Sequence, residues 1–512
     1  MPTNYRNPYS VNYTFNGLSG GDGAISSGVA TNAQVSSSLK AIYPVYMNFS
    51  AYAQDTWRAT ERTTLTYGAR WDVNPAPSVR SGPKPLVLSG SSVTQDQPLY
   101  DTRWFDIAPR IGLAYQMDTT ENREMMFRAG FGLFYDVGYG ITAGAFNGAP
   151  YSNDRTISLA TFPLSSSDLE PPVMPPEPPY GQVTGATSGL KSPIVYQWNT
   201  AIERYFGKGQ MLSIGYSGTK GRRLLRTESQ PSFGDTYEMA TVATNGSTSD
   251  YHGLQVQFRR RLSANVQTQV SYTWSHSIDS SSNDMGFGGG FASLFGGGQR
   301  GSSDYDVRHN LSFSGSYRLY APRRGIAGAL LGEWYLDWVA AARTGVPFDV
   351  QGLTSDTSSD SDDNSSTPRN FRGGAFAQVR PDYTGKPLWV SDPNAPGGRR
   401  LNREAFKEPD GYAQGNLGRN VLRGFGTFQA DVALRRQFAI WERWRLNLSA
   451  QAFNVFNNPN FANPSPNEGA NLSSPNFGVM TRMLNQSFGG GAGSPYRSGG
   501  PRSVELVLRL QF

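Results

Sequence analysis

The sequence predicts an all-β fold, a transmembrane antiparallel β-barrel with long extracellular loops, and three observations carry this prediction. Apolar and polar side chains alternate along 502–512, with Val507 as the single exception, and a period of two is typical of a strand with one apolar face. The 512 residues include 58 Gly, 33 Pro and 12% aromatics, as expected for many strands and turns. Short turns alternate with long loops between the predicted strands, an asymmetry that transmembrane barrels show.

The composition excludes several other classes of protein. The negative mean hydropathy excludes a bundle of membrane helices but not a barrel, whose strands are half polar and whose loops are wet. Cysteine is absent, which excludes disulfides, thiolate metal sites and cysteine nucleophiles. The formal charge of +6 is spread along the chain, and its basic clusters lack a helical frame. We therefore expect a solvated surface and no nucleic-acid partner.

About fourteen strands are visible as alternating patterns, and their lengths suit a tilted membrane crossing of roughly 9–11 residues. In one of them, Leu65, Tyr67 and Trp71 face away from Thr66 and Arg70. The predicted strands lie near 9–15, 46–57, 62–73, 104–117, 124–136, 194–206, 211–218, 254–262, 266–275, 308–319, 332–344, 426–438, 443–455 and 502–512. Irregular connections are expected at about 16–45, 74–103, 137–193, 219–250 and 345–425.

Two stretches test the barrel prediction. The apolar stretch 326–342 has Glu333 and Asp337 within it, and neither its length nor its charge suits a lone membrane helix. Trp334, Leu336 and Trp338 alternate with other residues there, which indicates a strand. The N-terminus has no charged segment followed by an apolar one, so we expect no signal peptide. Because an outer-membrane protein must be exported, we expect the natural beginning of the protein to be missing.

Tryptophans mark the ends of several predicted strands. An interfacial aromatic girdle requires such positions on both sides of a membrane. The alternative is that these rings are ordinary core aromatics. The predicted girdle consists of Trp57, Trp71, Trp104, Trp441 and Trp444.

Six motifs carry a resemblance to a known family. They are SAYAQDTW with LTYGARWD (50–57, 65–72), FDIAPRIGLAY with FRAGFGLFYD (105–115, 127–136), YHGLQVQFRRRLSANVQTQVSYTWSHSID (251–279), DVRHNLSFSGSY (306–317), GNLGRNVLRGFG (415–426) and QAFNVFNNPNF (451–461). In this order, across nearly the whole chain, they resemble the TonB-dependent outer-membrane receptors of the Oar-like kind.

The resemblance implies a 22-stranded barrel in the outer membrane of a Gram-negative bacterium. It also implies a preceding periplasmic domain and a plug, on which TonB pulls using the proton gradient of the inner membrane. The sequence shows no plug and no TonB-contacting segment. We therefore expect residues 1–512 to form one unit, the C-terminal portion of such a barrel, with TonB as a partner only if a plug is supplied upstream.

Candidate chemistry is sparse. His252, His276 and His309 lie on three strands or strand ends, where they can either form a metal site or each make a hydrogen bond near the membrane interface. No nucleophile–base arrangement, P-loop or zinc spacing is present. We therefore predict no enzyme activity, no cofactor and no metal site.

Charged loops allow two further interpretations. The acidic run 354–367 carries Asp356, Asp360, Asp362 and Asp363, which can either bind Ca²⁺ or form a disordered, solvated loop tip. Two basic groups either contact lipopolysaccharide phosphates or line the lumen. These groups are Arg222, Arg223 and Arg226, and separately Arg259 to Arg261.

Phe512 ends the last predicted strand. The resemblance implies that such a terminal aromatic is a signal for the barrel-assembly machinery. The terminal strand also needs a partner strand, because open edges are not tolerated in lipid. We expect its partner along the sequence to be 443–455.

Three functions are compatible with these observations. The first is a receptor or transporter barrel that binds or takes up a bulky solute at the cell surface, with its specificity in the loops 137–193, 277–307 and 345–425. The second is a surface-binding or adhesive protein that transports nothing. The third is a porin-like channel, since a barrel of about fourteen strands without a plug leaves a wet lumen. In each case we expect outer-membrane lipid and lipopolysaccharide as neighbours.

Overall fold

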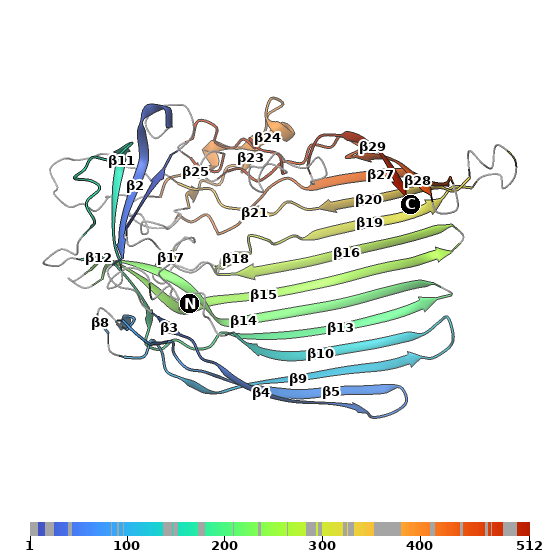
Figure 1. Cartoon of the computed structure of the whole chain (residues 1–512), viewed down its shortest axis with the longest axis horizontal. Coiled ribbons are helices and arrows are strands. Elements are labelled where there is room, and N and C mark those ends of the chain that lie inside the picture. Colours follow the sequence, from blue (N-terminus) through green and yellow to red (C-terminus); the bar gives the residue numbers. More distant parts are fainter. Residues whose placement is uncertain are drawn as a thin grey trace.

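The computed structural model is nearly all β (Figure 1). Among the residues it describes, no helix combines the length and the apolar character needed to cross a membrane. The described part of the chain includes three single turns of 3-10 helix, η1 (Ile25–Ser27), η3 (Pro396–Gly398) and η4 (Arg403–Ala405). The structure describes residues 9–15, 25–38, 43–82, 84–89, 92–95, 97–136, 146, 152–172, 180–207, 209–233, 237–263, 265–282, 293–294, 300–320, 325, 332–352, 380–409, 415–440, 444–465, 469–472, 474–484 and 499–512.

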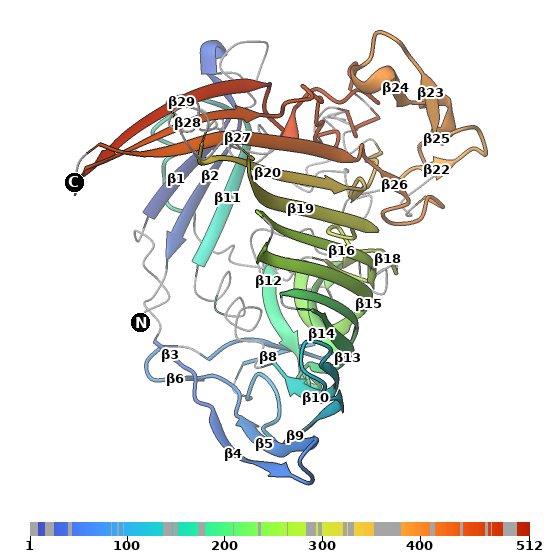
Figure 2. The same cartoon turned by 90° about the vertical axis from the view of Figure 1, so that its right-hand side faces the viewer.

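Thirteen strands follow one another in a single curved wall, each antiparallel to the next (Figure 2). This confirms the predicted all-β barrel class and the predicted strand at 332–344. The strands are β4 (Phe49–Arg58), β5 (Thr63–Asn74), β9 (Arg103–Asp118), β10 (Met125–Tyr135), β13 (Ile194–Phe206), β14 (Gln210–Phe233), β15 (Tyr237–Ser263), β16 (Val266–Asp279), β19 (His309–Arg318), β20 (Trp334–Arg343), β27 (Thr427–Ala439), β28 (Arg445–Phe453) and β29 (Ser503–Gln511).

The wall has one apolar and one polar face because its side chains alternate along every strand. In β29, Val504, Leu506 and Leu508 are 71%, 77% and 68% exposed, an exposure that water would penalise and lipid would not. The register pairs Leu508 with Leu448 of β28, as predicted for the terminal strand, and so continues the apolar face. We call this face the outer face and the opposite, polar face the inner face.

Two glycines of the outer face lie under tryptophan rings. A Cβ on Gly218 would lie 2.3 Å from Trp198 Cε2, and a Cβ on Gly315 would lie 2.2 Å from Trp338 Cζ2. The registers pair each glycine with its tryptophan on the neighbouring strand. Each indole therefore covers a strand position that has no side chain of its own, which a larger residue could not occupy.

Short turns gather at one end of the wall and long connections at the other (Figure 1). The C-terminus lies at the end with the short turns (Figure 1). Two of these turns, 59–62 and 119–124, join neighbouring strands of the wall. We call the end with the long connections the outer rim, because transmembrane barrels carry their long loops outside the cell.

The prediction of a loop at 219–250 is wrong. Strands β14 and β15 continue past the other strands as one long hairpin, with a register irregularity near Gly221. There β15 pairs in parallel with β12 (Tyr180–Thr187), which pairs with β7 (Val87–Ser89), itself paired with β8 (Ser92–Thr94). This part of the hairpin packs Ala240 and Val242 into a small core with Leu86, Leu88 and Val183, and so short an apolar run does not show the pattern that reveals the other strands. Strand β17 (Ser293–Leu294) pairs with β14, and β18 (Gly301–Ser302) with β16.

The predicted first barrel strand lies outside the wall. Strand β1 (Tyr9–Thr14) pairs with β2 (Val29–Ser38), which pairs with β11 (Ser152–Thr161), in a separate three-stranded sheet. The connections 16–45 and 137–193 therefore contain strands that the sequence prediction missed. This sheet encloses its own small core of buried residues, Ala30, Ala33, Val35, Ala160 and Leu164.

The stretch 345–425, predicted to be irregular, also contains strands. They form the pairs β21 (Pro347–Phe348) with β26 (Leu422–Arg423), β22 (Asp382–Tyr383) with β25 (Phe406–Lys407), and β23 (Trp389–Ser391) with β24 (Arg399–Leu401). A further pair, β3 (Pro44–Val45) with β6 (Ser78–Val79), lies in the earlier connections. We call the described residues of 345–425 and 460–480 the rim unit. Its core consists of Phe348, Val350, Leu401, Ala405, Phe406, Leu417, Leu422, Ala470, Leu472 and Phe477.

Candidate functional site

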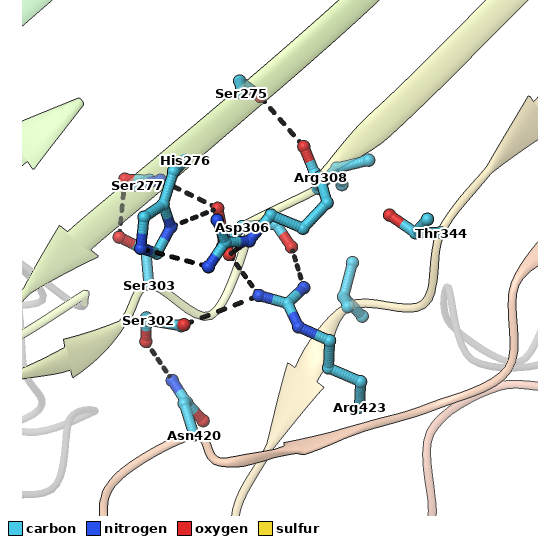
Figure 3. Close-up of polar contacts among 12 residues, drawn as sticks. Ser275, His276, Ser277, Ser302, Ser303, Asp306, Arg308, Thr344, Asn420 and Arg423 are labelled. Carbon is cyan, nitrogen blue, oxygen red and sulfur yellow. Dashed lines mark hydrogen bonds and ion pairs between the residues drawn. The ribbon is translucent and has the colours of Figure 1, made fainter. Parts of the chain in front are cut away.

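A buried carboxylate, Asp306, lies where the rim unit meets the wall (Figure 3). Asp306 belongs to the connection between β18 and β19 and is 1% exposed. The backbone amide of Ser277, near the end of β16, donates a hydrogen bond of 2.8 Å to Asp306 Oδ1. The backbone amide of Asp306 in turn donates a hydrogen bond of 2.9 Å to the Ser303 carbonyl oxygen, which closes a tight turn next to the carboxylate.

Two guanidinium groups neutralise this carboxylate. Arg308 Nε lies 3.2 Å from Asp306 Oδ2, and Arg423 Nη2 contacts the same oxygen. His276 Nδ1 lies 3.3 Å from Oδ1, while Arg308 Nη2 lies 3.0 Å from His276 Nε2. Because a guanidinium can only donate, we assign the proton of neutral His276 to Nδ1, facing the carboxylate. Burial of Asp306 favours its neutral form, but the Ser277 amide, Arg423 and His276 outweigh it and hold the pKa of Asp306 below its ordinary value.

Arg423 ties the rim unit to the wall. It lies in β26, and its Nη1 donates to the carbonyl oxygens of Asp306 at 2.9 Å and Gly345 at 3.3 Å. One side chain therefore joins the start of β19, the end of β20 and the last part of the rim unit. Since Asp306 is buried and the Arg423 side chain is only 28% exposed, loss of either partner would leave a poorly solvated charge.

A second ion cluster lies beside the first. Arg419 pairs with Asp279 of β16 and, at 3.1 Å, with Asp304. The Asn420 side-chain amide donates to the Ser302 carbonyl oxygen and to Asp304 Oδ1, both at 2.7 Å. The segment 415–425 is thus held against the outer rim at successive positions.

Asp349 anchors the same segment from inside the rim unit. The Asn420 backbone amide donates to Asp349 Oδ1 at 2.5 Å. Burial raises the pKa of Asp349 above its ordinary value, against the opposing effects of this hydrogen bond and of the nearby Arg380. Burial likewise lowers the pKa of Arg380, whose Nε donates to the Leu417 carbonyl oxygen at 3.2 Å.

An arginine sandwich stiffens the rim unit. The Arg399 guanidinium carbon lies 4.5 Å from the ring centroid of Trp389 and 4.6 Å from that of Phe425. Such cation–π contacts gain strength where water is excluded. Phe425 lies two residues before β27, so the sandwich connects the rim unit to the next strand of the wall.

This site consists of ion pairs and hydrogen bonds that hold two parts of the chain together, and we call it the clamp. Its carboxylates are matched by arginines, and within the described ranges no group of three or more His, Cys, Asp or Glu residues could hold a metal ion. The clamp, defined as Asp279, Asp304, Asp306, Arg308, Arg419, Asn420 and Arg423, instead fixes a folded unit onto the outer rim of the barrel.

Each predicted histidine makes hydrogen bonds of its own. His252 Nδ1 lies 2.7 Å from the Tyr216 hydroxyl, and His309 Nδ1 lies 2.8 Å from the Tyr272 hydroxyl. His276 belongs to the clamp. Each of the three residues thus has a polar partner of its own, and the register places His252 opposite His276 on the neighbouring strand.

The predicted girdle tryptophans lie at both ends of the wall. Trp57 and Trp444 are near the short turns, and Trp444 packs 5.4 Å from Phe512 between ring centroids. Trp71 and Trp104 are near the outer rim, where the Trp71 indole donates 2.6 Å to the Trp104 carbonyl oxygen. The four rings are 39–61% exposed, and the girdle remains a prediction. Trp441 lies outside the described residues.

The two basic groups lie in different parts of the structure. Arg226 is buried and donates to Glu228 Oε1 at 2.7 Å, so the lipopolysaccharide interpretation is wrong for it. Arg222, in contrast, pairs with Asp250 at 3.2 Å near the outer rim. Residues 259–261 lie beside the short turn after β15, at the end of the wall opposite the outer rim. Of these, Arg259 falls on the inner face, in agreement with the lumen interpretation.

Sequence reasoning missed the clamp, although its parts lie in quoted motifs. DVRHNLSFSGSY contains Asp306 and Arg308, and GNLGRNVLRGFG contains Arg419, Asn420 and Arg423. The available signal was the presence of charged residues just before a strand in each motif. The acidic run 354–367 lies outside the described residues.

Known proteins similar to this chain are outer-membrane proteins. The model of a family described as "Outer membrane beta barrel domain" matches residues 3–497. Similar solved structures include Pseudomonas aeruginosa FpvA bound to heterologous pyoverdines (9% identity, 94% of this chain, 44% of that chain, TM-score 0.45). The unliganded ferric citrate transporter FecA matches with 12% identity, 94% and 45% coverage and a TM-score of 0.40. The FrpB iron transporter from Neisseria meningitidis matches with 11% identity, 94% and 58% coverage and a TM-score of 0.35.

The chain spans less than two thirds of the length of these three structures, between 44% and 58%. No curated protein sequence matches it.

Proposed function

Because the chain belongs to the family of outer membrane beta barrel domains, we propose that it is a receptor or transporter barrel that binds or takes up a bulky solute at the cell surface. The protein lies in the outer membrane of a Gram-negative bacterium. A solute arriving from outside meets the outer rim first, and the rim unit and the long hairpin of β14 and β15 stand there. The polar inner face continues from the rim along the wall.

The clamp is the observation that carries this proposal. A passive channel works best with an open mouth, and an adhesive loop needs no attachment to the inner part of the rim. Here the rim unit has its own core and is held by buried carboxylates of the wall and of the connection before β19. A folded unit tied across neighbouring strands suits a mouth that recognises a solute before admitting it.

The partners follow from the same proposal. Phe512, exposed at the end of β29, serves as the signal for the barrel-assembly machinery. TonB couples to this barrel only through a plug supplied upstream. Arg222, Lys220 and Arg300 near the outer rim are placed to contact lipopolysaccharide phosphates, because Arg222 and Arg300 share the single carboxylate of Asp250 and leave a net positive charge.

Conductance of the full chain in planar lipid bilayers tests the proposal. We expect the wild-type protein to insert and to remain electrically quiet, because the clamped rim unit restricts the mouth. Arg423→Ala should open it and produce frequent conducting events. The matched control is Lys386→Ala, which removes an exposed ion pair with Glu404 within the same unit and should stay quiet.

A stable, open conductance in the wild-type protein would support the porin-like alternative and overturn the receptor proposal. A quiet wild-type protein whose Arg423→Ala variant is also quiet would show that the clamp does not control the mouth. The adhesive alternative predicts that no solute enters cells through the chain even when an upstream plug segment is supplied.

A further inference from the structure

A group of amide side chains from β13, β15, β16 and β19 lies together on the inner face of the wall, with β14 between the first two. Each falls on the same face by alternation, and the registers place them in adjoining rows. Gln255, for example, lies opposite Gly215 of β14 and Thr273 of β16, and Thr273 lies opposite Asn310 of β19. We call this group the amide panel; its members are Gln197, Asn199, Gln255, Gln257, Gln267, Gln269 and Asn310.

Hydroxyl groups fill most positions between these amides, and one charged residue, Arg259, lies among them, opposite Gln269. The inner-face neighbours within the panel are Ser213, Ser217, Thr219, Ser271, Thr273, Ser275, Ser312, Ser314 and Ser316. The other charged inner-face residues toward the short turns are Glu203, which lies opposite Ser213, and Arg318, which ends β19.

The strands on both sides of the panel are different because they carry paired charges. On β20 and β27, Asp337 and Arg435 form an ion pair across the register. On the other side, Arg128 Nε of β10 lies 3.6 Å from Oε2 of Glu203 on β13, the first strand of the panel. The inner face is therefore divided into a largely neutral polar part and charged flanks, which hydration of the lumen alone does not require.

The panel is accessible and has unused hydrogen-bonding capacity. Gln197, Asn199, Gln255, Gln267 and Asn310 are exposed, and the other two amides are half-buried. Each primary amide offers two donors and an acceptor with two lone pairs. The contact from Gln257 Nε2 to Ser271 Oγ is 3.4 Å long, so it is a weak hydrogen bond.

We propose that the amide panel binds a neutral oligosaccharide, an inference that rests on the proposed receptor function and names its substrate class. A sugar hydroxyl both donates and accepts, as do the amides and hydroxyls of the panel. An anionic metal chelate would require cationic partners, and a short zwitterionic peptide would require both signs of charge. The panel has a single cation beside it, Arg259, and no carboxylate among its members, so either ligand would lose most of its hydration there without replacement.

The test is calorimetric titration of the full chain, folded in detergent micelles, with four neutral hexasaccharides: malto-, cello-, xylo- and manno-oligosaccharides. Ferric citrate and tetraglycine serve as the anionic and zwitterionic comparison ligands. We expect at least one hexasaccharide to bind and neither comparison ligand to bind. The variant Gln255→Glu/Gln269→Glu should weaken that binding by about tenfold or more, because it removes two amide donors and places two carboxylates in the panel.

The control is Gln437→Glu, which adds one carboxylate to the inner face of β27, outside the panel, and should change the affinity by less than about twofold. Unchanged affinity in the double variant, with its heat-modifiable mobility intact, would show that the sugar binds elsewhere and would overturn the panel as its site. Binding of ferric citrate without any hexasaccharide would overturn the substrate class and leave the receptor function standing. No binding of any ligand to a protein that is quiet in bilayers would also overturn the oligosaccharide inference, whereas an open conductance would overturn the receptor function itself.

Discussion

Replacement of Asp306 by asparagine should detach the rim unit from the wall while the barrel stays folded. The buried carboxylate accepts hydrogen bonds from the Ser277 amide and from two guanidinium groups. Asparagine keeps one acceptor oxygen, but its NH₂ group faces donors that it cannot satisfy. Arg308 and Arg423 then lose their shared counter-ion. The variant therefore removes the charge that holds two strands and the rim unit together.

The expected magnitude follows from burial. Breaking a fully buried ion pair costs about 3–5 kcal/mol. The Arg308 and Arg423 side chains keep 35% and 28% of their exposure, so solvent screens part of the loss, and we discount it to about 2–3 kcal/mol. A tenfold change in an equilibrium constant corresponds to about 1.36 kcal/mol. The equilibrium constant for opening of the segment 415–425 should therefore rise roughly 30- to 150-fold.

Amide hydrogen exchange measures this opening directly. We expect faster exchange at amides of 415–425, such as Gly424, which donates to the Val346 carbonyl oxygen at 3.1 Å, and unchanged exchange in β16 and β19. Glu404→Gln is the matched control, since its exposed pair with Lys386 contributes little. Equal exchange in wild type and Asp306→Asn would refute the clamp. Faster exchange throughout the wall would show that Asp306 supports the barrel rather than the rim unit.

Three further outcomes are expected. The raised pKa of Asp349 means that the folded rim unit holds this proton more tightly than the unfolded chain does. Protection of 415–425 should therefore increase as the pH falls from neutral toward the unfolded value of about 3.9, and Asp349→Asn should abolish this increase; a persistent pH dependence would assign it to another group. Deleting Phe512, which packs on Trp444, should lower the yield of heat-modifiable protein in outer membranes, and a normal yield would contradict its role as an assembly signal. Leu508→Arg on the outer face should destabilise the barrel in lipid by about 2–4 kcal/mol, measured by urea unfolding in liposomes, whereas Val507→Arg on the inner face should cost less; equal losses would contradict the assignment of the two faces.

The pH dependence of Asp306 has the opposite sign. Its pKa is lowered in the folded protein, so its contribution to stability is present above the unfolded value of about 3.9 and is lost as the pH falls through the lower folded value. Mild acidification should therefore leave the Asp306 contacts intact. Release of the rim unit is expected only in strong acid.

The sequence alone was sufficient for the parts of the protein that lipid constrains. A strand in the membrane must present apolar side chains on every second position, and this pattern located β5, β10, β16 and β29 to within a few residues. The short turns between them were equally visible. The local alternation that lipid requires is therefore enough to locate these strands, with no need for information from distant residues.

Above the membrane this constraint ends, and there the tertiary structure decided the outcome. The upper part of the β14–β15 hairpin buries only short apolar runs, such as Ala240 and Val242 against Leu88, and these are too short to show a strand pattern, so it was predicted as a loop. The strand β1 has a good alternating pattern, yet it pairs with β2 and β11, because partner choice depends on surfaces that a pattern does not describe. The clamp joins Asp306 to Arg423 across more than a hundred residues, and only folding brings such distant charges within reach of one another.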